Sequence, residues 1–385
     1  MLTLTALLSA AIWAFLLFGW ARFWRADQLL EKHPSTLNAF PDVIALVPAR
    51  NEAPTIAACI SGLLSQAYKG RLTIVLIDDD SADATADEAR KTAAAHPQGA
   101  RLHIVPATDL APGWSGKLWA LENGFRHADA ALGRPAYYWL TDADIAHDPE
   151  TLTRLVSHAE TQDLALVSLM VRLHCETFWE HRLVPAFVFF FQMLYPFPAV
   201  NDPASPVAAA AGGCILLSAQ ARTAIGGLEA VHDQLIDDVA VGTAVKKAGL
   251  PIWLGLGEQS HSLRPATGLE SLWAMVTRTA FTQLHRSPSL LAGTLAGLAL
   301  TYLSPPLIAL TWPWHGSTLA ALLSLAAWTA MAVAYGPSLR YYARPLWEGL
   351  TLPAIAALYA VMTVHSAINH WRGAGALWKG RSYDA

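Results

Sequence analysis

The fold is decided by the stretch Ile74-Val75-Leu76-Ile77-Asp78-Asp79-Asp80-Ser81, in which an apolar run stops at acidic residues. The same design recurs at Val43–Val47, which runs into Pro48-Ala49-Arg50-Asn51-Glu52, and at Tyr137–Leu140, which runs into Thr141-Asp142-Ala143-Asp144. Helical stretches follow these runs, and strands that alternate with helices predict a mainly parallel, Rossmann-like sheet in an α/β domain. Ligands of such sheets bind outside the carboxyl ends of the strands, where these polar residues fall.

This α/β domain, expected over residues 41–286, is preceded by an apolar segment in residues 1–24. The run Leu2–Trp20 is almost uncharged and has about the length that crosses a bilayer. Positive charge follows it, at Arg22, Arg25 and Lys32, rather than preceding it as in a secretory signal. We therefore expect an uncleaved transmembrane anchor whose C-terminal side is cytoplasmic.

A second apolar region, residues 287–370, predicts C-terminal transmembrane helices. Its candidate spans are Leu290–Leu310, the rather short Leu319–Ala334, and Leu350–Ile368, which Pro353 interrupts. The arginines of Ser338–Arg344 and the basic tail, residues 371–385, both predict a cytoplasmic location. Ser338–Arg344 and the tail cannot both be cytoplasmic if all three segments cross the membrane. One segment is then re-entrant or interfacial, or the tail breaks the charge rule, and the sequence leaves this open.

Two segments of the α/β domain are unusually apolar. Residues 178–200 predict an interfacial hairpin, and residues 269–284 predict an amphipathic helix on the membrane surface. The alternative is that both belong to a buried core. The whole chain is 54% hydrophobic and 15% charged, against roughly 25% charged in ordinary soluble domains, which favours a membrane-embedded protein.

Other features of the composition exclude several classes of protein. The net charge is -4 and there is no basic stripe, so nucleic acid is not an expected partner. Cys59, Cys175 and Cys214 lie far apart without zinc-type spacing, which fits a reducing compartment.

The acidic residues are candidates for metal binding and for acid–base chemistry. Asp142 and Asp144 form a DxD motif after a strand, and one or two carboxylates together with substrate phosphates often hold Mg²⁺ or Mn²⁺. Asp237 and Asp238 open an expected helix, where one could be a general base that the other supports. The alternative for this pair is that both only complement the helix dipole.

Further candidates lie in small-residue turns. Lys117 follows Gly113-Trp114-Ser115-Gly116 at a helix start, where a compact ammonium group suits a diphosphate. The alternative is a surface lysine. Gly213 follows the small-residue run Ala208–Ala211 and would let a substrate approach the backbone, although it could equally mark a tight bend.

Taken in order, these motifs resemble those of the family 2 glycosyltransferases, which have the GT-A fold, across roughly Pro41 to Arg286. The matching stretches are Val47-Pro48-Ala49-Arg50-Asn51-Glu52, Asp78-Asp79-Asp80-Ser81, Gly116-Lys117 with Ala120-Leu121-Glu122-Asn123-Gly124, Asp142-Ala143-Asp144 and Asp237-Asp238. More narrowly, the chain resembles the hopene-associated glycosyltransferases of hopanoid-making bacteria. That match extends over nearly the whole chain, to Gly113-Trp114-Ser115-Gly116-Lys117, Arg278-Thr279-Ala280-Phe281-Thr282-Gln283 and Trp378-Lys379-Gly380-Arg381.

The resemblance implies an inverting, metal-dependent hexosyl transfer from a nucleotide-diphospho-sugar to a lipid acceptor, with a hopanoid-related acceptor as the narrower expectation. It also implies a multi-pass protein of the bacterial inner membrane, with the catalytic domain in the cytoplasm. Asp144 would ligate Mg²⁺ or Mn²⁺ and Asp142 would support the metal or the ribose. Asp238 would be the base, with Asp237 next in line. The remaining residues would bind the donor (Pro48, Arg50, Asn51, Glu52, Asp78, Asp79 and Lys117) or the acceptor or a phosphate (Gly213 and Arg278).

The chain departs from the family pattern at three points. Asp80 precedes Ser81 where many relatives have glycine, and the third acidic pair is Asp-Asp rather than the commoner Glu-Asp. The Gln-x-x-Arg-Trp signature of processive synthases is absent, which argues against processive synthesis. Alternative functions are transfer to another lipid, such as a polyprenyl phosphate or a ceramide-like acceptor, and a catalytically inactive membrane scaffold. A transporter is disfavoured because the few candidate spans lack charged residues.

Overall fold

We describe the protein from a computed structural model that covers residues 1–31, 37, 39–373, 377–378 and 381–382. The predicted basic positions Lys32 and Lys379 lie outside these described residues. In the described part of the chain, one eight-stranded sheet has the strand order β3-β2-β1-β4-β7-β6-β8-β5. Its strands are β1 (Val43–Ala49), β2 (Leu72–Asp78), β3 (Leu102–Pro106), β4 (Tyr137–Thr141), β5 (Ile145–His147), β6 (Leu166–Arg172), β7 (Cys214–Ser218) and β8 (Ile252–Ser262).

The sheet is mainly parallel, as predicted. Strands β3, β2, β1 and β4 pair in parallel, as do β6 and β8, whereas β7 and β5 run against their neighbours. Helices cover both faces, which explains why the strands are continuously apolar. One face packs against α2 (Ile56–Leu64), α3 (Thr85–Ala95) and α5 (Thr151–Gln162), and the other against α4 (Gly116–His127), α8 (Ala219–Ala224) and α9 (Asp237–Lys247).

Strand β1 continues through Pro48 to Ala49, two residues beyond the apolar run Val43–Val47 from which the strand was predicted. Pro48 pairs with Ile77 and Ala49 pairs with Asp78 on the β2 side. On the β4 side the pairing has already ended, at Leu46 with Leu140. Proline lacks an N–H group, so it fits the sheet here because no neighbour on that side requires one.

Two helix starts that carry predicted site residues form as expected. The hydroxyl of Ser115 accepts a hydrogen bond from the Leu118 amide and caps α4, so Lys117 lies in the first turn. Helix α9 begins at Asp237, and its Gly242 lies against the backbone of Ala209. Both helices therefore present their N-terminal turns to the same edge of the sheet.

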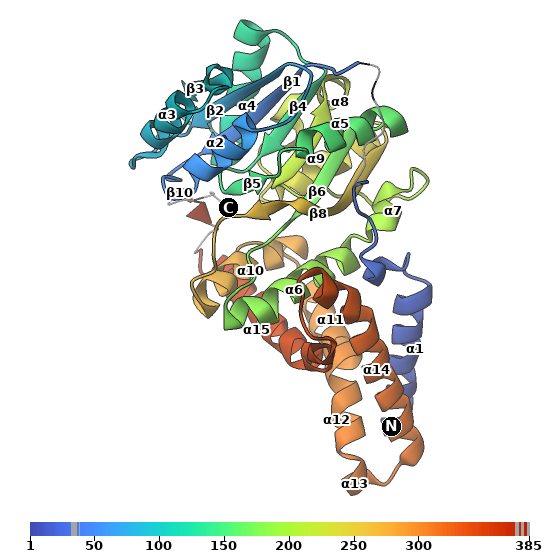
Figure 1. Cartoon of the computed structure of the whole chain (residues 1–385). Coiled ribbons are helices and arrows are strands. Elements are labelled where there is room, and N and C mark those ends of the chain that lie inside the picture. The colour runs from blue at the N-terminus through green and yellow to red at the C-terminus, as the bar shows by residue number, and fades with distance from the viewer. Residues whose placement is uncertain (32–36, 38, 374–376, 379–380, 383–385) are drawn as a thin grey trace.

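The remaining helices lie below the sheet domain, as Figure 1 shows, and form a layer beneath it and a stalk. The layer contains α6 (Phe178–Leu194), α10 (Leu269–Gln283) and α15 (Leu352–Trp371). The stalk contains α1 (Leu2–Phe18), α11 (Pro288–Leu298), which continues into α12 (Ser304–Leu310), α13 (Trp312–His315) and α14 (Thr318–Tyr341). Shorter elements are α7 (Phe197–Asn201), a π-helical turn at Ala299–Leu303, a 3-10 helix at Leu346–Thr351, and the strands β9 (Leu377–Trp378) and β10 (Arg381–Ser382).

Three details of the helical part differ from the sequence prediction. The hairpin expected in residues 178–200 is instead the single helix α6, which continues through Pro185 and is followed by α7. Pro353 does not interrupt the last apolar segment, because it lies in the first turn of α15, where no helical N–H partner is lost. Helix α14 extends to Tyr341 and is longer than expected.

Among the described residues, three helical segments are long and apolar enough to cross a membrane: Pro288–Leu310, Thr318–Tyr341 and Leu346–Trp371. Helix α1, predicted as an anchor, is apolar but shorter. It packs in the stalk, where the indole N–H of Trp13 donates to the Thr301 carbonyl over 2.8 Å.

The close approach of α9 to residue Ala209 gives a stability prediction. A Cβ atom added at Gly242 would lie 2.7 Å from the Ala209 carbonyl carbon, so Gly242→Ala must push the helix away from the backbone. We expect a loss of about 1–3 kcal/mol in unfolding free energy, measured by tryptophan fluorescence during thermal unfolding in detergent. Gly297→Ala is the control, since that helical glycine has no heavy atom within 4 Å; equal stability of the two variants would contradict this packing.

Candidate active site

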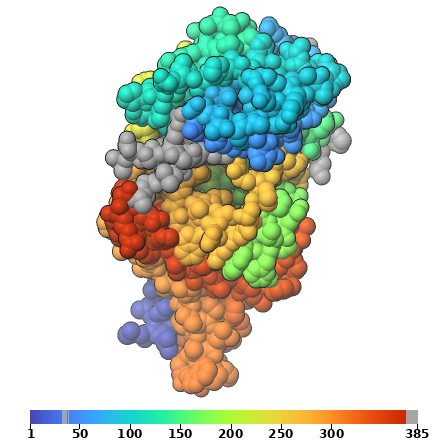
Figure 2. Space-filling view, turned by 90° about the vertical axis from the view of Figure 1, so that its left-hand side faces the viewer, coloured from blue at the N-terminus to red at the C-terminus, as the bar shows by residue number. Residues whose placement is uncertain are grey.

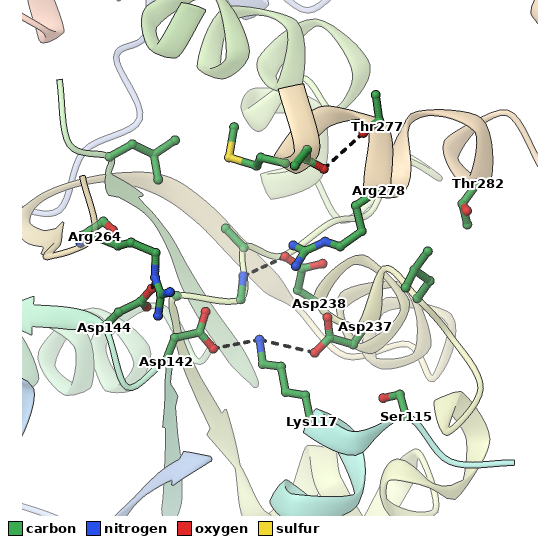
Figure 3. Close-up of a pocket in the computed structure, with 18 of the residues that line it drawn as sticks. Ser115, Lys117, Asp142, Asp144, Asp237, Asp238, Arg264, Thr277, Arg278 and Thr282 are labelled. Carbon is green, nitrogen blue, oxygen red and sulfur yellow. Dashed lines mark hydrogen bonds and ion pairs between the residues drawn. The ribbon is translucent and has the colours of Figure 1, made fainter. Parts of the chain in front are cut away.

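Four carboxylates from two parts of the sequence line one cavity. Asp142 and Asp144 follow β4, and Asp237 and Asp238 open α9, so both pairs reach the carboxyl edge of the sheet. The cavity has a volume of about 1130 Å³. Figure 2 shows the hollow between the sheet domain above and the helices below. The sequence predicted this convergence, and the close-up in Figure 3 shows the four side chains around one lysine.

That lysine, Lys117, is the shared cation of the cluster. Its Nζ atom lies 2.8 Å from Oδ1 of Asp142 and 3.5 Å from Oδ2 of Asp237. Burial alone would lower the pKa of Lys117, but the neighbouring carboxylates outweigh burial and raise it. Lys117 is therefore a fixed positive charge between the two acidic pairs. A Cβ atom added at Gly212 would come within 3.1 Å of its Nζ atom, so the glycine leaves room for the ammonium group.

Asp238 lies beside this ion pair but is held by backbone amides. Its Oδ2 atom accepts a hydrogen bond of 2.7 Å from the Gly212 amide, and its Oδ1 atom accepts one of 2.8 Å from the Val239 amide. Burial, followed by the charge of Asp237, raises the pKa of Asp238 to about 6, although Lys117 opposes the shift. A carboxylate with a pKa near 6 is suited to accept a proton at neutral pH.

Arg264 closes the opposite side of the cluster, and sequence reasoning missed it. Its Nε atom donates to Oδ2 of Asp144 over 2.9 Å, and its Nη2 atom donates to Oε2 of Glu52. Arg264 lies two residues after the end of β8, and a position just beyond a strand end could have identified it from the sequence. The DxD motif thus meets two resident cations, Lys117 at Asp142 and Arg264 at Asp144.

Arg264 belongs to a connection that we call the strap, residues 263–268 between β8 and α10. The Leu263 amide donates to the Asp144 carbonyl over 2.8 Å, and the Ala266 amide donates to Oε1 of Glu180 over 2.6 Å. Glu180 is fully buried at the start of α6. Burial would raise the pKa of Glu180, but several backbone amides lower it to about 2, so this carboxylate stays ionised. The strap is therefore tied both to the acidic cluster and to the helical layer.

The predicted donor-binding residues separate into two groups. Pro48 and Glu52 line the cavity beside Lys117 and Asp142. A second group lies near the end of β2, outside the cavity lining, and consists of Arg50, Asn51, Asp78 and Asp79. There the Arg50 guanidinium donates to the carbonyls of Asp79 and Asp80, and the Asn51 side chain accepts from the Ala82 amide.

The lower half of the cavity has a different character. Apolar side chains of α6 and α10 line it, namely Val184, Phe187, Phe191, Leu272 and Met275. Gly213 and Arg278, the two residues predicted to face the acceptor or a phosphate, also line the cavity. Arg286 and His370 also line the cavity, and the sequence did not indicate this because they lie on segments far apart in the chain. Figure 3 shows the Arg278 side chain extending from its helix toward Asp238.

The donor atoms fit a divalent cation that a substrate helps to hold. Among the described residues, no group of three or more His, Cys, Asp or Glu side chains is placed to bind a metal without other ligands. Asp142 and Asp144 do offer carboxylate oxygens, and Mg²⁺ or Mn²⁺ often needs only one or two of these together with phosphate oxygens. Both carboxylates are paired with cationic side chains, so a metal ion would compete with Lys117 and Arg264 for them.

Residues 44–222 match the family model described as Glycosyl transferase family 2. These residues are similar to a family 2 glycosyltransferase domain. The match contains β1, β2, β4 and the DxD motif, and it ends before Asp237.

A curated relative matches part of the same domain. It is the undecaprenyl-phosphate mannosyltransferase of Micrococcus luteus, 29% identical over 130 residues, which are 34% of this chain and 49% of the relative. The chain thus spans about half the length of this relative.

One solved structure supports the GT-A fold. Mannosyltransferase PcManGT from Pyrobaculum calidifontis, in complex with GDP-Man and Mn²⁺, has a TM-score of 0.54 at 22% identity, covering 96% of this chain and 99% of its own. Glucosyl-3-phosphoglycerate synthase of Mycobacterium tuberculosis has a TM-score of 0.41 at 19% identity, covering 63% of this chain and 80% of its own. The first similarity shows that the GT-A fold together with its helical part has a structural counterpart.

The competition between Arg264 and a metal for Asp144 can be measured without turnover. We expect Arg264→Met to bind Mn²⁺ about fivefold more tightly, because it removes a half-exposed cation worth roughly 1 kcal/mol from the carboxylate. Titration followed by electron paramagnetic resonance would report the affinity. Arg90→Met, which removes an exposed ion pair with Asp87 on α3, is the control. Unchanged affinity in Arg264→Met would exclude Asp144 from the cation site.

Proposed function

We propose that the protein transfers a sugar from a nucleotide-diphospho-sugar to a membrane lipid, at the cytoplasmic face of a bacterial inner membrane. One observation carries the proposal: a single cavity joins the acidic cluster of the glycosyltransferase domain to apolar side chains of α6 and α10. A soluble sugar acceptor would not need that apolar half. The lipid could keep its apolar body beside these helices while its polar end reaches Asp238.

In this proposal the upper half of the cavity binds the donor. Asp142 and Asp144 would hold Mg²⁺ or Mn²⁺, which supplies Lewis-acid stabilisation of the departing diphosphate. Lys117, already placed between the acidic pairs, would lie beside the negative charge that the leaving group gains. Pro48 and Glu52 would border the nucleotide, and the residues at the end of β2, including Asp78 and Asp79, would support the nucleoside side.

Asp238 would act as the base in an inverting displacement. It accepts the proton of the acceptor hydroxyl as that oxygen forms a bond to the anomeric carbon. The bond from this carbon to the diphosphate oxygen breaks, and its electron pair leaves with the nucleoside diphosphate. The two backbone amides that fix Asp238 support the role because they aim the carboxylate into the cavity.

The lower half of the cavity is consistent with two classes of acceptor. A hopanoid-type hydroxyl lipid is our first candidate, supported by the motifs that extend to Arg278-Thr279-Ala280-Phe281-Thr282-Gln283 and by a base with a raised pKa. A polyprenyl phosphate is the second candidate. It is supported by the name of the Micrococcus relative and by Arg278 and Arg286, which line the cavity and form no ion pair with the described carboxylates.

Replacing the base gives the most direct test of the mechanism. We expect Asp238→Asn to lower transfer by about 10²–10⁴-fold while donor binding, measured by calorimetry, changes little. In the wild type, the rate should fall below about pH 6, because protonated Asp238 cannot accept a proton. In Asp237→Asn this fall in rate should occur at lower pH, since the substitution removes a charge that raises the pKa of Asp238. Wild-type turnover by Asp238→Asn would disprove the assignment.

The acceptor can be identified by comparing lipids from cells with and without the protein by mass spectrometry. A hopanoid that gains one sugar mass only when the protein is present is the expected result, and a hexosylated polyprenyl phosphate would favour the second candidate.

The variant Arg278→Gln separates the two classes of acceptor further. Loss of this cation should strongly weaken the binding of a phosphate acceptor and should change the binding of a neutral hydroxyl acceptor little. A lipid-acceptor function would be contradicted if cells with and without the protein contained the same lipids and hydrolysed the sugar nucleotide at the same rate.

A further inference from the structure

We infer that α15 does not cross the membrane, although it is long and apolar enough to do so. The bilayer is crossed by α1, by α11 with α12, and by α14, while α15 begins partway along α14 and returns to the side of the sheet domain. There it forms part of the wall of the cavity. This inference concerns the surface that meets the bilayer and is independent of the proposed reaction.

Exposed aromatic side chains mark two boundaries of the apolar region. Trp312 and Trp314, in the turn before α14, are 47% and 82% exposed. Beyond the other end of α14, Trp347 is 60% exposed, and Phe178 is 62% exposed. Tryptophan and other amphipathic aromatic residues gather at membrane–water interfaces. Since exposed rings are found at both ends of α14, this helix provides a measure of the distance between the two boundaries.

The length of α14 matches a bilayer. From Thr318 to Ser338 the helix rises by about 30 Å, at 1.5 Å per residue. The hydrocarbon core of a typical bilayer is about 30 Å thick. The surface between the two boundaries carries exposed aliphatic side chains, including Leu319, Leu322, Leu325 and Val333. The stalk thus presents one bilayer thickness of apolar surface.

The boundary near Trp347 carries charges that suit the headgroup region. Arg344 binds Oε1 of Glu348 over 2.6 Å, and Arg182 lies 3.1 Å from the same oxygen. The Arg182 guanidinium also stacks on the rings of Phe178 and Trp347, with distances of 5.5 and 5.6 Å to the ring centroids. Arginines that lie along aromatic rings while their heads reach polar groups are typical of an interface.

Neither end of α15 reaches the far boundary at Trp312 and Trp314. Its start follows the 3-10 helix Leu346–Thr351, which folds back along α14, so that the indole N–H of Trp328, near the middle of α14, donates to the Leu350 carbonyl over 3.2 Å. Its end packs against α10, where the rings of His370 and Trp371 lie 5.5 and 5.6 Å from the ring of Phe281. Figure 1 shows α15 running obliquely beneath the sheet domain, beside α10 and away from the tip of the stalk at α13. A crossing helix would have its ends on opposite sides.

Polar contacts fix α15 in this position. The indole N–H of Trp273 donates to Nδ1 of His365 over 2.7 Å. The Ser366 hydroxyl accepts a hydrogen bond from the Phe281 amide and donates to the Thr277 carbonyl, so it bridges two backbone groups one turn apart in α10. These contacts join α15 to the helix that follows the strap, and they place Asn369 and His370 in the cavity wall.

This arrangement removes the conflict between the charge rule and three C-terminal crossings. The arginines at the end of α14 and Arg372 after α15 both lie on the side of the sheet domain, as their positive charge predicts. The N-terminus and the α13 turn lie on the opposite side. The last apolar segment is the re-entrant one among the possibilities that the sequence left open.

Thiol labelling in vesicles of known orientation tests the inference without using activity. In a Cys175→Ser background, single cysteines replace exposed residues at Ala94 on α3, Thr318 at the start of α14 and Arg372 after α15. Cys59 and Cys214 are buried and should stay unlabelled by a membrane-impermeant maleimide. We expect Arg372→Cys and Ala94→Cys to be labelled in the same vesicle orientation, and Thr318→Cys in the opposite one.

Two outcomes would overturn the inference. Labelling of Arg372→Cys together with Thr318→Cys would mean that α15 crosses, and labelling of Thr318→Cys together with Ala94→Cys would mean that the stalk does not cross. Pro313→Cys and Gly373→Cys form a second pair that repeats the comparison if one of the first variants is not produced. Because the readout is relative to the sheet domain, failure here leaves the proposed transfer reaction untouched.

Discussion

The placement of Lys117 among four carboxylates is the interaction on which the rest of the site depends. Without a cation, two acidic pairs at one edge of a sheet would repel each other and raise one another's pKa. Lys117 binds one member of each pair, at 2.8 and 3.5 Å, and leaves Asp238 to the amides of Gly212 and Val239. Removing a single partner from such a cluster leaves a charge uncompensated, which is why its members should behave as a unit.

The strap extends this electrostatic arrangement to the membrane side of the molecule. Arg264 neutralises Asp144 and Glu52 at one end, and the Ala266 amide binds Glu180 of α6 at the other. Only two residues separate Ala266 from α10, which carries Arg278 and is in turn bonded to Ser366 of α15. A displacement of Arg264 by a metal ion would therefore act on a segment joined to both helices that line the lower half of the cavity. In the proposed reaction, binding of the donor and access of the acceptor would both depend on this short connection.

Most of the fold could be predicted because it follows from local patterns. The apolar runs that end at Asp78 and Asp142 form strands, and the pair Asp237-Asp238 begins a helix. Both could be predicted because hydrophobic periodicity and helix capping depend on residues that are neighbours in the sequence. What could not be predicted depends on contacts between distant segments. Pro48 remains within a strand because β4 has already ended beside it, and Arg264 reaches Asp144 across 120 positions of sequence. The sequence of α15 predicts a membrane span, because the groups on α10 that bind its polar side chains lie far away in the sequence.

The charges of the cavity bear on which acceptor fits its lower half. A phosphate monoester is already anionic at neutral pH, since its second pKa is about 6, so its attack on a sugar needs no base. A hydroxyl must lose its proton during attack and gains most from a positioned carboxylate. Asp238 is held by two amides and has a raised pKa, an arrangement that favours a hydroxyl acceptor. Arg278 extends toward the same carboxylate, and an anion bound there would lie close to the negative charge of Asp238. Attraction to the arginine and repulsion by the aspartate would then oppose each other, whereas a neutral hydroxyl meets no such conflict.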